Sequence, residues 1–397
     1  MRTGVWAGGL AIAALSLTGC SGFWNAPSSG GGGGGGKTTL TSGDVYVLNV
    51  AKNEFVGLFV NAGTLTALGS PYTLASAPIA ITIAPNNNFL YVSTLNGIFV
   101  YTIDTSTGLL TQGNNGQPIT ADAATAMQVD PTNTWLIEGG AGTQAVYAIK
   151  INSSTGVLAT SGEAQIAANL PSSTVNQIAI SPDGTFVLVA NGSQGTATIP
   201  FSAANNNPFG SVGRISPVNT SAGAALSVAF DPVLSGLTAP RVFYIGETAA
   251  ASGTNSGRLR AFNFSTVKEI TGSPFAIGGL APSSILPLAS GQYVYVVSRQ
   301  TSSSSNPNTG VIAGFSIAFT NNTPALTALG SSFTTGTNPQ GLVEDSSHQF
   351  VFAVDFGGSP DLIGYTFDAT TAGNLDQVIS SQTGTDPVQA GAIAAIH

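Results

Sequence analysis

A four-strand unit recurs along the chain from Asp44 to the end, and this repeat constrains the fold more than any other feature. Each copy opens with a short apolar run that often ends in proline, as in "IAITIAP" (79–85) and "IAISP" (178–182). After a tight polar turn comes a second run rich in Val, Tyr, Phe and Ile, which is typical of a β-strand. The second runs begin at Val45, Phe89, Thr134, Phe186, Val242, Tyr293 and Phe350.

A third, alternating run and a weaker fourth run complete each copy. A turn with glycine precedes the fourth run, as in "DTSTGLLTQ" (104–112), "NSSTGVLAT" (152–160) and "TTAGNLDQV" (370–378); glycine supplies the positive φ that such turns need. Seven copies of four antiparallel strands predict an all-β chain folded as a single seven-bladed β-propeller. A parallel β-helix is the alternative, but its repeats are shorter and lack hairpin turns.

The repeat also predicts how the propeller closes. The pattern begins at a second strand, at Val45, and ends at a first strand, "AGAIAAI" (390–396). We therefore expect the C-terminal strand to supply the missing innermost strand of the first blade. Closure of this kind removes the free sheet edges that would otherwise invite aggregation.

The strand sequences carry a family resemblance. Runs such as "FLYVST" (89–94) and "FVLVAN" (186–191), preceded by "SPDG" (181–184) or its variants, resemble the YVTN-type propeller repeat. The span 44–397 resembles the seven-bladed lactonase family, which includes 6-phosphogluconolactonases and muconate cycloisomerases. The resemblance implies His, Arg and Glu side chains on the channel face that open or close a lactone. The resemblance rests on the repeated pattern of strands and turns, which determines a fold but not an activity.

The N-terminal segment has the layout of a secretory signal. Arg2 gives a positive start, residues 5–17 are mostly apolar, and "LTGC" (17–20) follows. This tetrapeptide resembles the bacterial lipobox, in which the cysteine is lipidated. Cys20 is the only cysteine, so it has no partner for an internal disulfide. The sequence predicts a lipoprotein signal peptide over 1–20, and the alternative is an ordinary signal peptide with a chance cysteine.

Residues 21–43 contain seven consecutive glycines, Gly30 to Gly36, and are predicted to form a flexible tether between the anchor and a propeller over 44–397. We expect an exported protein held in the cell envelope through lipidated Cys20. Ser21 stands where an aspartate would suggest retention in the inner membrane, which favours the outer membrane.

The charge pattern excludes some partners. Only 7% of the residues are charged, the formal net charge is −8, and the sequence has no Lys/Arg cluster. Because nucleic-acid binding requires a basic patch, nucleic acid is not an expected partner. No calcium-binding loop of the D-x-D-x-D-G type occurs, so we expect neither a metal site nor a cofactor. A monomer is expected, with the membrane as one partner and a glycan or an envelope protein as another.

Aligning the repeats shows a polar position at the end of every second strand. These residues are Asn49, Thr94, Glu138, Asn191, Glu247, Ser298 and Asp355. One hypothesis is an acidic rim around the channel mouth that binds a cation or polar ligand, with Glu138, Asn191, Glu247 and Asp355 as candidate ligands. The alternative is local: short polar side chains bond the backbone of the turn that follows.

Cations and histidines are scarce. Arg258 and Arg299 both follow a second strand in neighbouring blades, so they form the candidate cation pair at the same rim; exposed rim charges are the alternative. His348 lies in the turn between the first and second strands of the last blade, and His397 is the last residue. Neither is expected to be catalytic, and the sequence identifies no catalytic residue.

Long polar loops after the second strands of the last three blades, at 248–257, 300–310 and 356–361, add a surface suited to binding. The sequence therefore favours an exported, membrane-anchored binding or scaffold module with a polar acidic rim. The alternative is a lactonase-like hydrolase, a carboxylic ester hydrolase that acts on a sugar lactone. A third possibility resembles the lipoprotein propeller of the outer-membrane barrel-assembly machinery.

Overall fold

The computed structural model describes residues 43–61, 64–119, 123–140, 142–159, 165–172, 174–248, 250–251, 254–255, 257–299, 309–380 and 386–397. The chain divides into two units, Met1–Thr38 and Thr39–His397, and the described residues all belong to the second. The predicted signal peptide, Cys20 and all but the last residue of the predicted tether lie outside the described residues. Within the described ranges no helix has the length and hydropathy of a membrane span.

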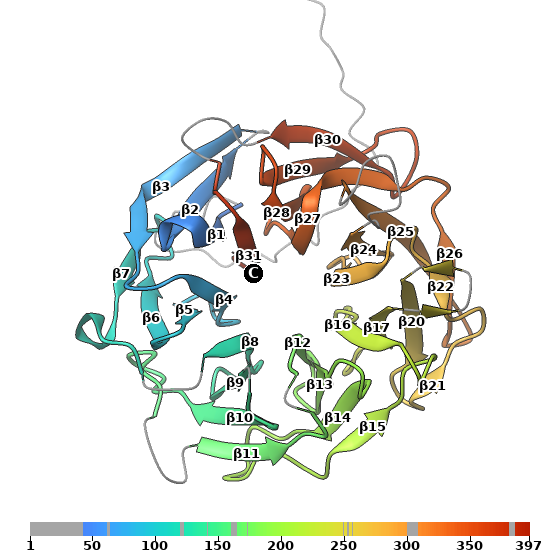
Figure 1. Cartoon of the computed structure of the whole chain (residues 1–397), viewed down its shortest axis with the longest axis horizontal. Coiled ribbons are helices and arrows are strands. Elements are labelled where there is room, and N and C mark those ends of the chain that lie inside the picture. The colour runs from blue at the N-terminus through green and yellow to red at the C-terminus, as the bar shows by residue number, and fades with distance from the viewer. Residues whose placement is uncertain are drawn as a thin grey trace, which may run out of the picture. The chain divides into compact units, whose positions relative to one another are not determined.

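The described strands assemble into seven antiparallel blades (Figure 1). From blade 1 to blade 7 the innermost strands are β31 (Ala390–Ala395), β4 (Pro78–Ile83), β8 (Ala124–Val129), β12 (Gln177–Ile180), β16 (Ala224–Phe230), β23 (Ala281–Pro287) and β27 (Phe333–Glu344). The second strands are β1 (Val45–Asn49), β5 (Phe89–Thr94), β9 (Trp135–Gly140), β13 (Phe186–Ala190), β17 (Val242–Thr248), β24 (Tyr293–Arg299) and β28 (Phe350–Gly357).

The two outer strands of each blade complete the sheets. The third strands are β2 (Glu54–Asn61), β6 (Gly97–Ile103), β10 (Ala145–Lys150), β14 (Thr196–Pro200), β20 (Arg258–Asn263), β25 (Thr309–Thr320) and β29 (Leu362–Phe367). The fourth strands are β3 (Thr64–Thr73), β7 (Leu110–Gln112), β11 (Gln165–Asn169), β15 (Gly213–Ile215), β21 (Lys268–Glu269) with β22 (Phe275–Ala276), β26 (Thr323–Ala328) and β30 (Leu375–Ser380). A small hairpin, β18 (Ala250–Ala251) with β19 (Thr254–Asn255), and two short 3₁₀ helices, η1 (Val50–Lys52) and η2 (Asn114–Gly116), lie between strands.

The C-terminal strand closes the ring as the sequence predicts. β31 pairs antiparallel with β1, with Val45 opposite Ala395 and Val47 opposite Ile393. Each innermost strand contacts the next, from β31 through β4, β8, β12, β16, β23 and β27 back to β31. Figure 1 shows these strands around the central opening. The prediction of a seven-bladed propeller closed by its C-terminal strand is confirmed.

The hydrophobic core lies between the blades. The described buried apolar side chains form seven clusters, and each cluster is shared by two neighbouring blades. The second strands are buried on both faces because a blade covers each side, which explains why they read as continuous Val, Tyr, Phe and Ile runs rather than as alternating ones. Burial of this kind supplies the main stabilisation, at about 25 cal/mol per Å² of apolar surface.

A tyrosine–glycine contact recurs between blades and gives the repeat its Tyr and Gly positions. The Tyr91 hydroxyl donates to the Gly156 carbonyl of the next blade at 2.9 Å, and Tyr295 donates to Gly373 at 2.7 Å. Both glycines have positive φ, and a Cβ would lie 2.4 Å from Phe89 at Gly156 and 2.3 Å from Tyr293 at Gly373. Only glycine can both adopt the positive φ and fit in the space beside the neighbouring ring. Its carbonyl accepts the tyrosine hydrogen bond, so this turn residue joins two blades as well as closing the hairpin.

Two features differ from the sequence expectation. In blade 3 the fourth strand is β11, whereas "NSSTGVLAT" (152–160) contributes only a single bridge, between Ile151 and Leu158. In blade 7, β27 is long enough to serve two sheets: its first residues pair with β25 and its later residues pair with β28. The first difference concerns an outer strand, and outer strands are less constrained because they have a neighbouring strand on one side only.

Candidate functional site

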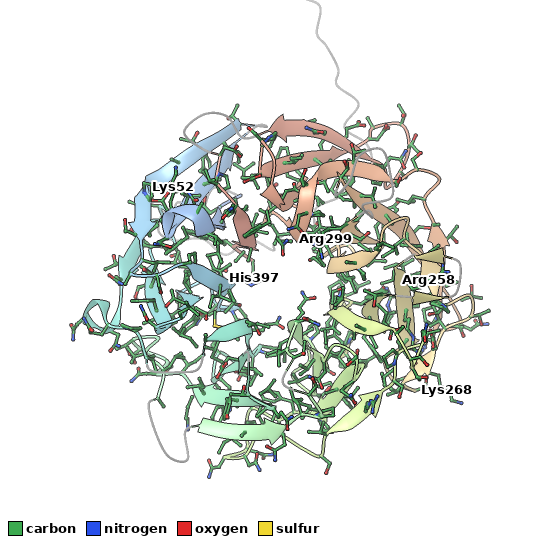
Figure 2. All side chains as sticks on the ribbon, viewed as in Figure 1. Lys52, Arg258, Lys268, Arg299 and His397 are labelled. Carbon is green, nitrogen blue, oxygen red and sulfur yellow. The ribbon has the colours of Figure 1, made fainter. Side chains whose placement is uncertain are left out.

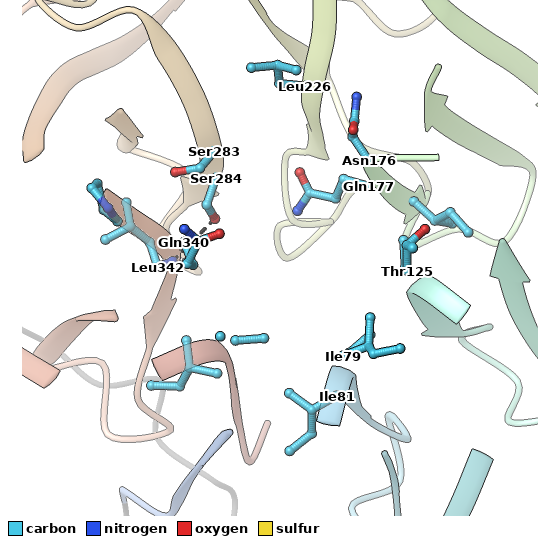
Figure 3. Close-up of a pocket in the computed structure, with 18 of the residues that line it drawn as sticks. Ile79, Ile81, Thr125, Asn176, Gln177, Leu226, Ser283, Ser284, Gln340 and Leu342 are labelled. Carbon is cyan, nitrogen blue, oxygen red and sulfur yellow. Dashed lines mark hydrogen bonds between the residues drawn. The ribbon is translucent and has the colours of Figure 1, made fainter. Parts of the chain in front are cut away.

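The described innermost strands surround a cavity of about 600 Å³. All seven blades contribute to its wall. The polar wall residues are Thr125, Asn176, Gln177, Ser283, Ser284, Arg299, Asn338 and Gln340, and the larger apolar ones are Ile79, Ile81, Met127, Ile178, Leu226, Leu342 and Ile393. Figure 3 shows Ser283, Ser284 and Gln340 across the opening from Asn176 and Gln177, with Ile79 and Ile81 on a third side. Pockets of this size accept small organic ligands.

A β-bulge at the start of the innermost strand points a residue into this cavity. The register against the second strand shifts in each of five innermost strands. The shift lies between the first and third residues of β4 and β8, between the second and fourth residues of β16 and β23, and at Pro339/Gly341 in β27. The residues inside these shifts are Ile79, Thr125, Leu226, Ser283 and Gln340, and every one of them lines the cavity. Bulges redirect side chains and are frequent next to active sites.

The amide side chains of the wall also join the blades. Gln177 Oε1 accepts from the Val228 backbone at 3.0 Å, and Asn176 Nδ2 donates to the Ala225 carbonyl at 2.9 Å. Gln340 Nε2 donates to the Asn338 carbonyl at 2.9 Å. Because an amide can make up to about four hydrogen bonds, these residues are held in place and still retain capacity for a ligand.

Arg299 is the candidate residue that the structure places at the cavity. It ends β24, opposite Ala281 and Gly310 in the strand ladders, and its side chain is exposed. Figure 2 shows Arg299 near the central opening, whereas Arg258 lies toward the periphery of the ring. Arg258 starts β20 and does not belong to the cavity wall, so the predicted Arg258–Arg299 pair is not brought together. Arg299 supplies the positive charge in the described part of this wall.

The seven polar residues at the ends of the second strands are all buried, with at most 2% of their surface exposed. The hydrogen bonds of Thr94 and Asn191 fit the local alternative. Thr94 Oγ1 donates to the Gly97 carbonyl and accepts from the Asn96 backbone, and Asn191 Nδ2 donates to the Ser172 carbonyl at 3.0 Å. None of the seven lines the cavity, and a ligand-binding role for Glu138, Asn191 or Asp355 stays a prediction.

Asp355 has an environment that favours its neutral form. It is fully buried, and burial raises its pKa to about 7, partly offset by the hydrogen bond from the Thr335 hydroxyl. That hydroxyl lies 2.9 Å from Oδ2. Asp355 therefore acts in the structure as a polar group between β27 and β28.

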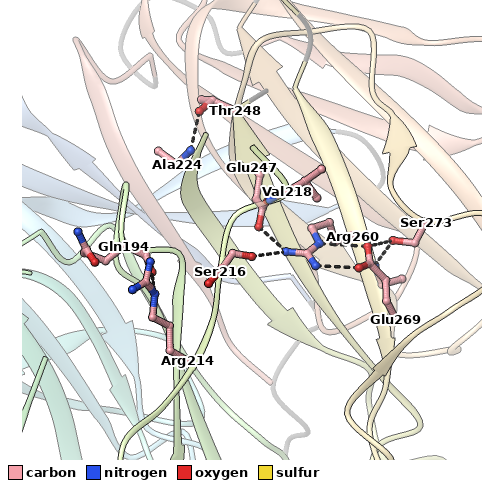
Figure 4. A network of polar contacts seen from close by, with 11 residues as sticks. Gln194, Arg214, Ser216, Val218, Ala224, Glu247, Thr248, Arg260, Glu269 and Ser273 are labelled. Atoms are coloured by element: carbon pink, nitrogen blue, oxygen red, sulfur yellow. Dashed lines mark hydrogen bonds and ion pairs between the residues drawn. The ribbon is translucent and has the colours of Figure 1, made fainter. Parts of the chain in front are cut away.

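Glu247 belongs to an ion-pair network away from the cavity wall, which Figure 4 shows. Arg260 Nη1 lies 2.9 Å from Glu247 Oε1, and Arg260 Nη2 lies 2.7 Å from Glu269 Oε2. The other Glu247 oxygen accepts from the Val218 backbone at 3.0 Å. Burial opposes the charge on Arg260, but the hydrogen bonds that Arg260 donates to Glu269 and the charge of Glu247 outweigh it and raise the Arg260 pKa. Both Glu247 oxygens are thus engaged within the protein.

The two histidines line a second pocket, of about 360 Å³, at the opposite mouth of the channel. His348 lies in the turn after β27, as predicted, and its Nδ1 is 3.3 Å from Glu344 Oε1. His397 is held by Asn87, through hydrogen bonds of 3.0 and 2.8 Å to its backbone. Within the described ranges no group of three or more His, Cys, Asp or Glu residues is placed to hold a metal ion.

Sequence reasoning missed the polar wall of the cavity. The signal was present: most first strands are apolar, but "NQIAI" (176–180), "SSILPL" (283–288) and "NPQGLVED" (338–345) begin with amides or hydroxyls. These amides bond the neighbouring blade as well as lining the cavity, as Gln177 and Asn176 do. In a propeller an amide at the start of an innermost strand faces the channel.

Comparisons with known proteins agree with this architecture. Residues 41–175 match the family model of the lactonases with a seven-bladed β-propeller. The periplasmic gluconolactonase of Pseudomonas aeruginosa is 15% identical, with a TM-score of 0.65 over 89% of this chain and 98% of that one. The proposed 6-phosphogluconolactonases of Bacteroides uniformis (15% identical, TM-score 0.65, 89% and 98% covered) and Bacteroides fragilis (13%, 0.66, 90% and 99%) are similar to the same extent. None of the curated proteins matches this chain.

Proposed function

We propose that this chain, which resembles the seven-bladed lactonase propellers, takes a sugar lactone into its central cavity and hydrolyses the ring. The observation that carries the proposal is Arg299 at the cavity, beside walls of amide and hydroxyl groups. The family match over residues 41–175 supports it, as do the related structures named for lactonases.

Each part of the wall has a role in the proposed reaction. Amides such as Gln177 and Gln340 hydrogen-bond the hydroxyl groups of the sugar. Water attacks the lactone carbonyl, and the Arg299 guanidinium stabilises the negative charge that develops on the carbonyl oxygen. The attacking water gives its proton to solvent, the ring C–O bond breaks, and the released oxygen takes up a proton. The product is a hydroxy acid whose carboxylate pairs with Arg299.

The first experiment measures ring opening of glucono-δ-lactone by the purified protein, after subtraction of the spontaneous rate. We expect Arg299→Gln to lower the enzymatic rate by about 100-fold, the size of effect seen when one oxyanion donor is removed. Arg258→Gln is the matched control, because Arg258 lies away from the cavity, and it should keep the wild-type rate. An Arg299→Gln rate equal to that of the wild type would contradict the proposal.

Binding without turnover is the second candidate. The described wall consists of amides, hydroxyls, aliphatic groups and a guanidinium, and none of these moves a proton readily at neutral pH. A binding or scaffold module would use the same cavity, or the loops at its rim, for a glycan or an envelope protein. Calorimetry with gluconate that shows binding, in a protein that leaves glucono-δ-lactone to open at the spontaneous rate, would favour this candidate.

Export and anchoring are a separate proposal, which rests on "LTGC" (17–20) and the glycine-rich segment after it. Two acyl chains suffice for stable membrane binding, at about 0.8 kcal/mol per buried CH₂. In a bacterial host, the full chain should sediment with membranes and the Cys20→Ala variant should not. Mass spectrometry of the N-terminal peptide should find acyl groups on Cys20. An unmodified Cys20 in a membrane-free protein would overturn the proposal.

A further inference from the structure

The pocket at the second mouth of the channel gathers ionisable groups that the proposed lactone site does not use. We call it the lower pocket. It lies between the β23–β24 turn, the β27–β28 turn and the end of β31, and its wall includes Glu344, His348 and His397. No residue of this wall belongs to the larger cavity.

Glu344 is the centre of the lower pocket. Its side chain is only 10% exposed. One carboxylate oxygen, Oε2, accepts from the Ala289 backbone at 2.7 Å, and the other faces His348 Nδ1 at 3.3 Å. Burial is the main cause of the raised Glu344 pKa. A buried carboxylate is stabilised by a cation that contacts it, because burial without a partner disfavours its charged form.

The other ionisable groups around Glu344 can be assigned. Asp345 is buried, and both of its oxygens are engaged: Oδ1 accepts from the Gln349 and Phe350 backbones, and Oδ2 accepts from the Ser347 backbone and hydroxyl. Burial is the main cause of the raised Tyr295 pKa, with smaller contributions from Tyr293 and from the charge of Glu344, and the Tyr295 hydroxyl donates to the Gly373 carbonyl. Burial lowers the pKa of His397, which favours its neutral form. The pocket is thus negative when both imidazoles are neutral.

The remaining wall is aliphatic. Leu286, Pro287, Val343 and Ile396 line the pocket beside Glu344. A pocket with an apolar wall and one buried carboxylate complements a ligand with an apolar body and one positive end. The volume of about 360 Å³ is ample for a short aliphatic body.

We propose that the lower pocket binds a small organic ammonium ion, a protonated primary amine with a short aliphatic chain. The ammonium group donates to Glu344 Oε1, in the place that His348 Nδ1 now faces, and the chain lies against Leu286 and Val343. The His348 imidazole is the side chain that faces this oxygen in the free protein, so it competes with the amine for Glu344 Oε1.

The test uses n-butylammonium as the probe and n-butanol as its uncharged counterpart, with calorimetry on the full chain at pH 8. Butylammonium should bind at least about tenfold more tightly than butanol, and Glu344→Gln should weaken it by about tenfold or more, because a charge-assisted hydrogen bond is lost. Asp376→Asn removes an exposed carboxylate of β30 and is the matched control, with binding unchanged. Equal binding of amine and alcohol, or full binding by Glu344→Gln, would overturn the proposal.

A second variant, His348→Asn, tests the proposal independently in case Glu344→Gln does not fold. His348 has a positive φ of 57°, which asparagine tolerates well, so His348→Asn should fold normally. Because this change removes the imidazole that faces Glu344 Oε1, His348→Asn should bind butylammonium at pH 8 at least as tightly as the wild type. A folded His348→Asn variant that no longer binds butylammonium would contradict the proposed contact at Glu344.

Discussion

A chain shortened to end at Gln389 should fail to form the native propeller. The missing strand, β31, pairs with β1 and contacts both β4 and β27. Ile393 and Ile396 are at most 9% exposed, and burying each is worth about 1.5–3 kcal/mol. With the lost strand hydrogen bonds, we expect a cost of about 5–10 kcal/mol, which equals the whole stability of many domains. Thermal unfolding followed by circular dichroism measures it.

Addition of the missing strand as a peptide provides the control. A synthetic peptide of residues 390–397 should restore cooperative unfolding to the shortened chain, because it can pair with β1 and bond to Asn87. A peptide with asparagine in place of Ile393 should restore less. If the shortened chain melts at the same temperature as the full chain, the pairing of β31 with β1 does not contribute to the stability of the propeller.

The sequence was informative about β31 because strand periodicity is local. The first and second runs of each repeat stay recognisable in isolation, so counting them was enough to predict that Ala390–Ala395 completes the blade that starts at Val45. Outer strands are less regular. β11 begins at Gln165 rather than within 152–160, since an outer strand has a neighbour on one side only and its register is less constrained.

The candidate site was harder to predict, because it depends on side-chain direction. Aligning the repeats found the column that contains Glu247 and Asp355, but it could not show that neighbouring chain segments cover those side chains. The cavity wall depends on β-bulges that point Thr125, Ser283 and Gln340 inward. A bulge shifts the alternation of side chains by one residue, so a simple two-residue period assigns these positions to the wrong face.

The ion-pair network at Glu247 shows what a polar position at the end of a second strand contributes when it is not a ligand site. Glu247 is 1% exposed, and its charge is balanced by Arg260, which also holds Glu269 and the Ser216 carbonyl. These contacts tie β17 to β20 and to the segment that precedes β16. The arrangement is stabilising only while both charges are present, because a buried charge without a partner is costly.

We therefore expect Arg260→Met to lower the free energy of unfolding by about 3–5 kcal/mol at pH 7, since it leaves the Glu247 carboxylate buried and unpaired. The loss should shrink as the pH falls, because Glu247 can then take up a proton in the folded variant. Arg260→Met with Glu247→Gln should recover most of the stability at pH 7. Urea unfolding at pH 7 and pH 5 measures all three proteins.

Arg214→Met is the matched control for this prediction. Arg214 is exposed, and its guanidinium donates to the Gln194 carbonyl. Its loss therefore leaves no buried charge without a partner. We expect a change of at most about 1 kcal/mol. An Arg260→Met variant that unfolds within about 1 kcal/mol of the wild type would mean that the network does not carry the stability of blade 5.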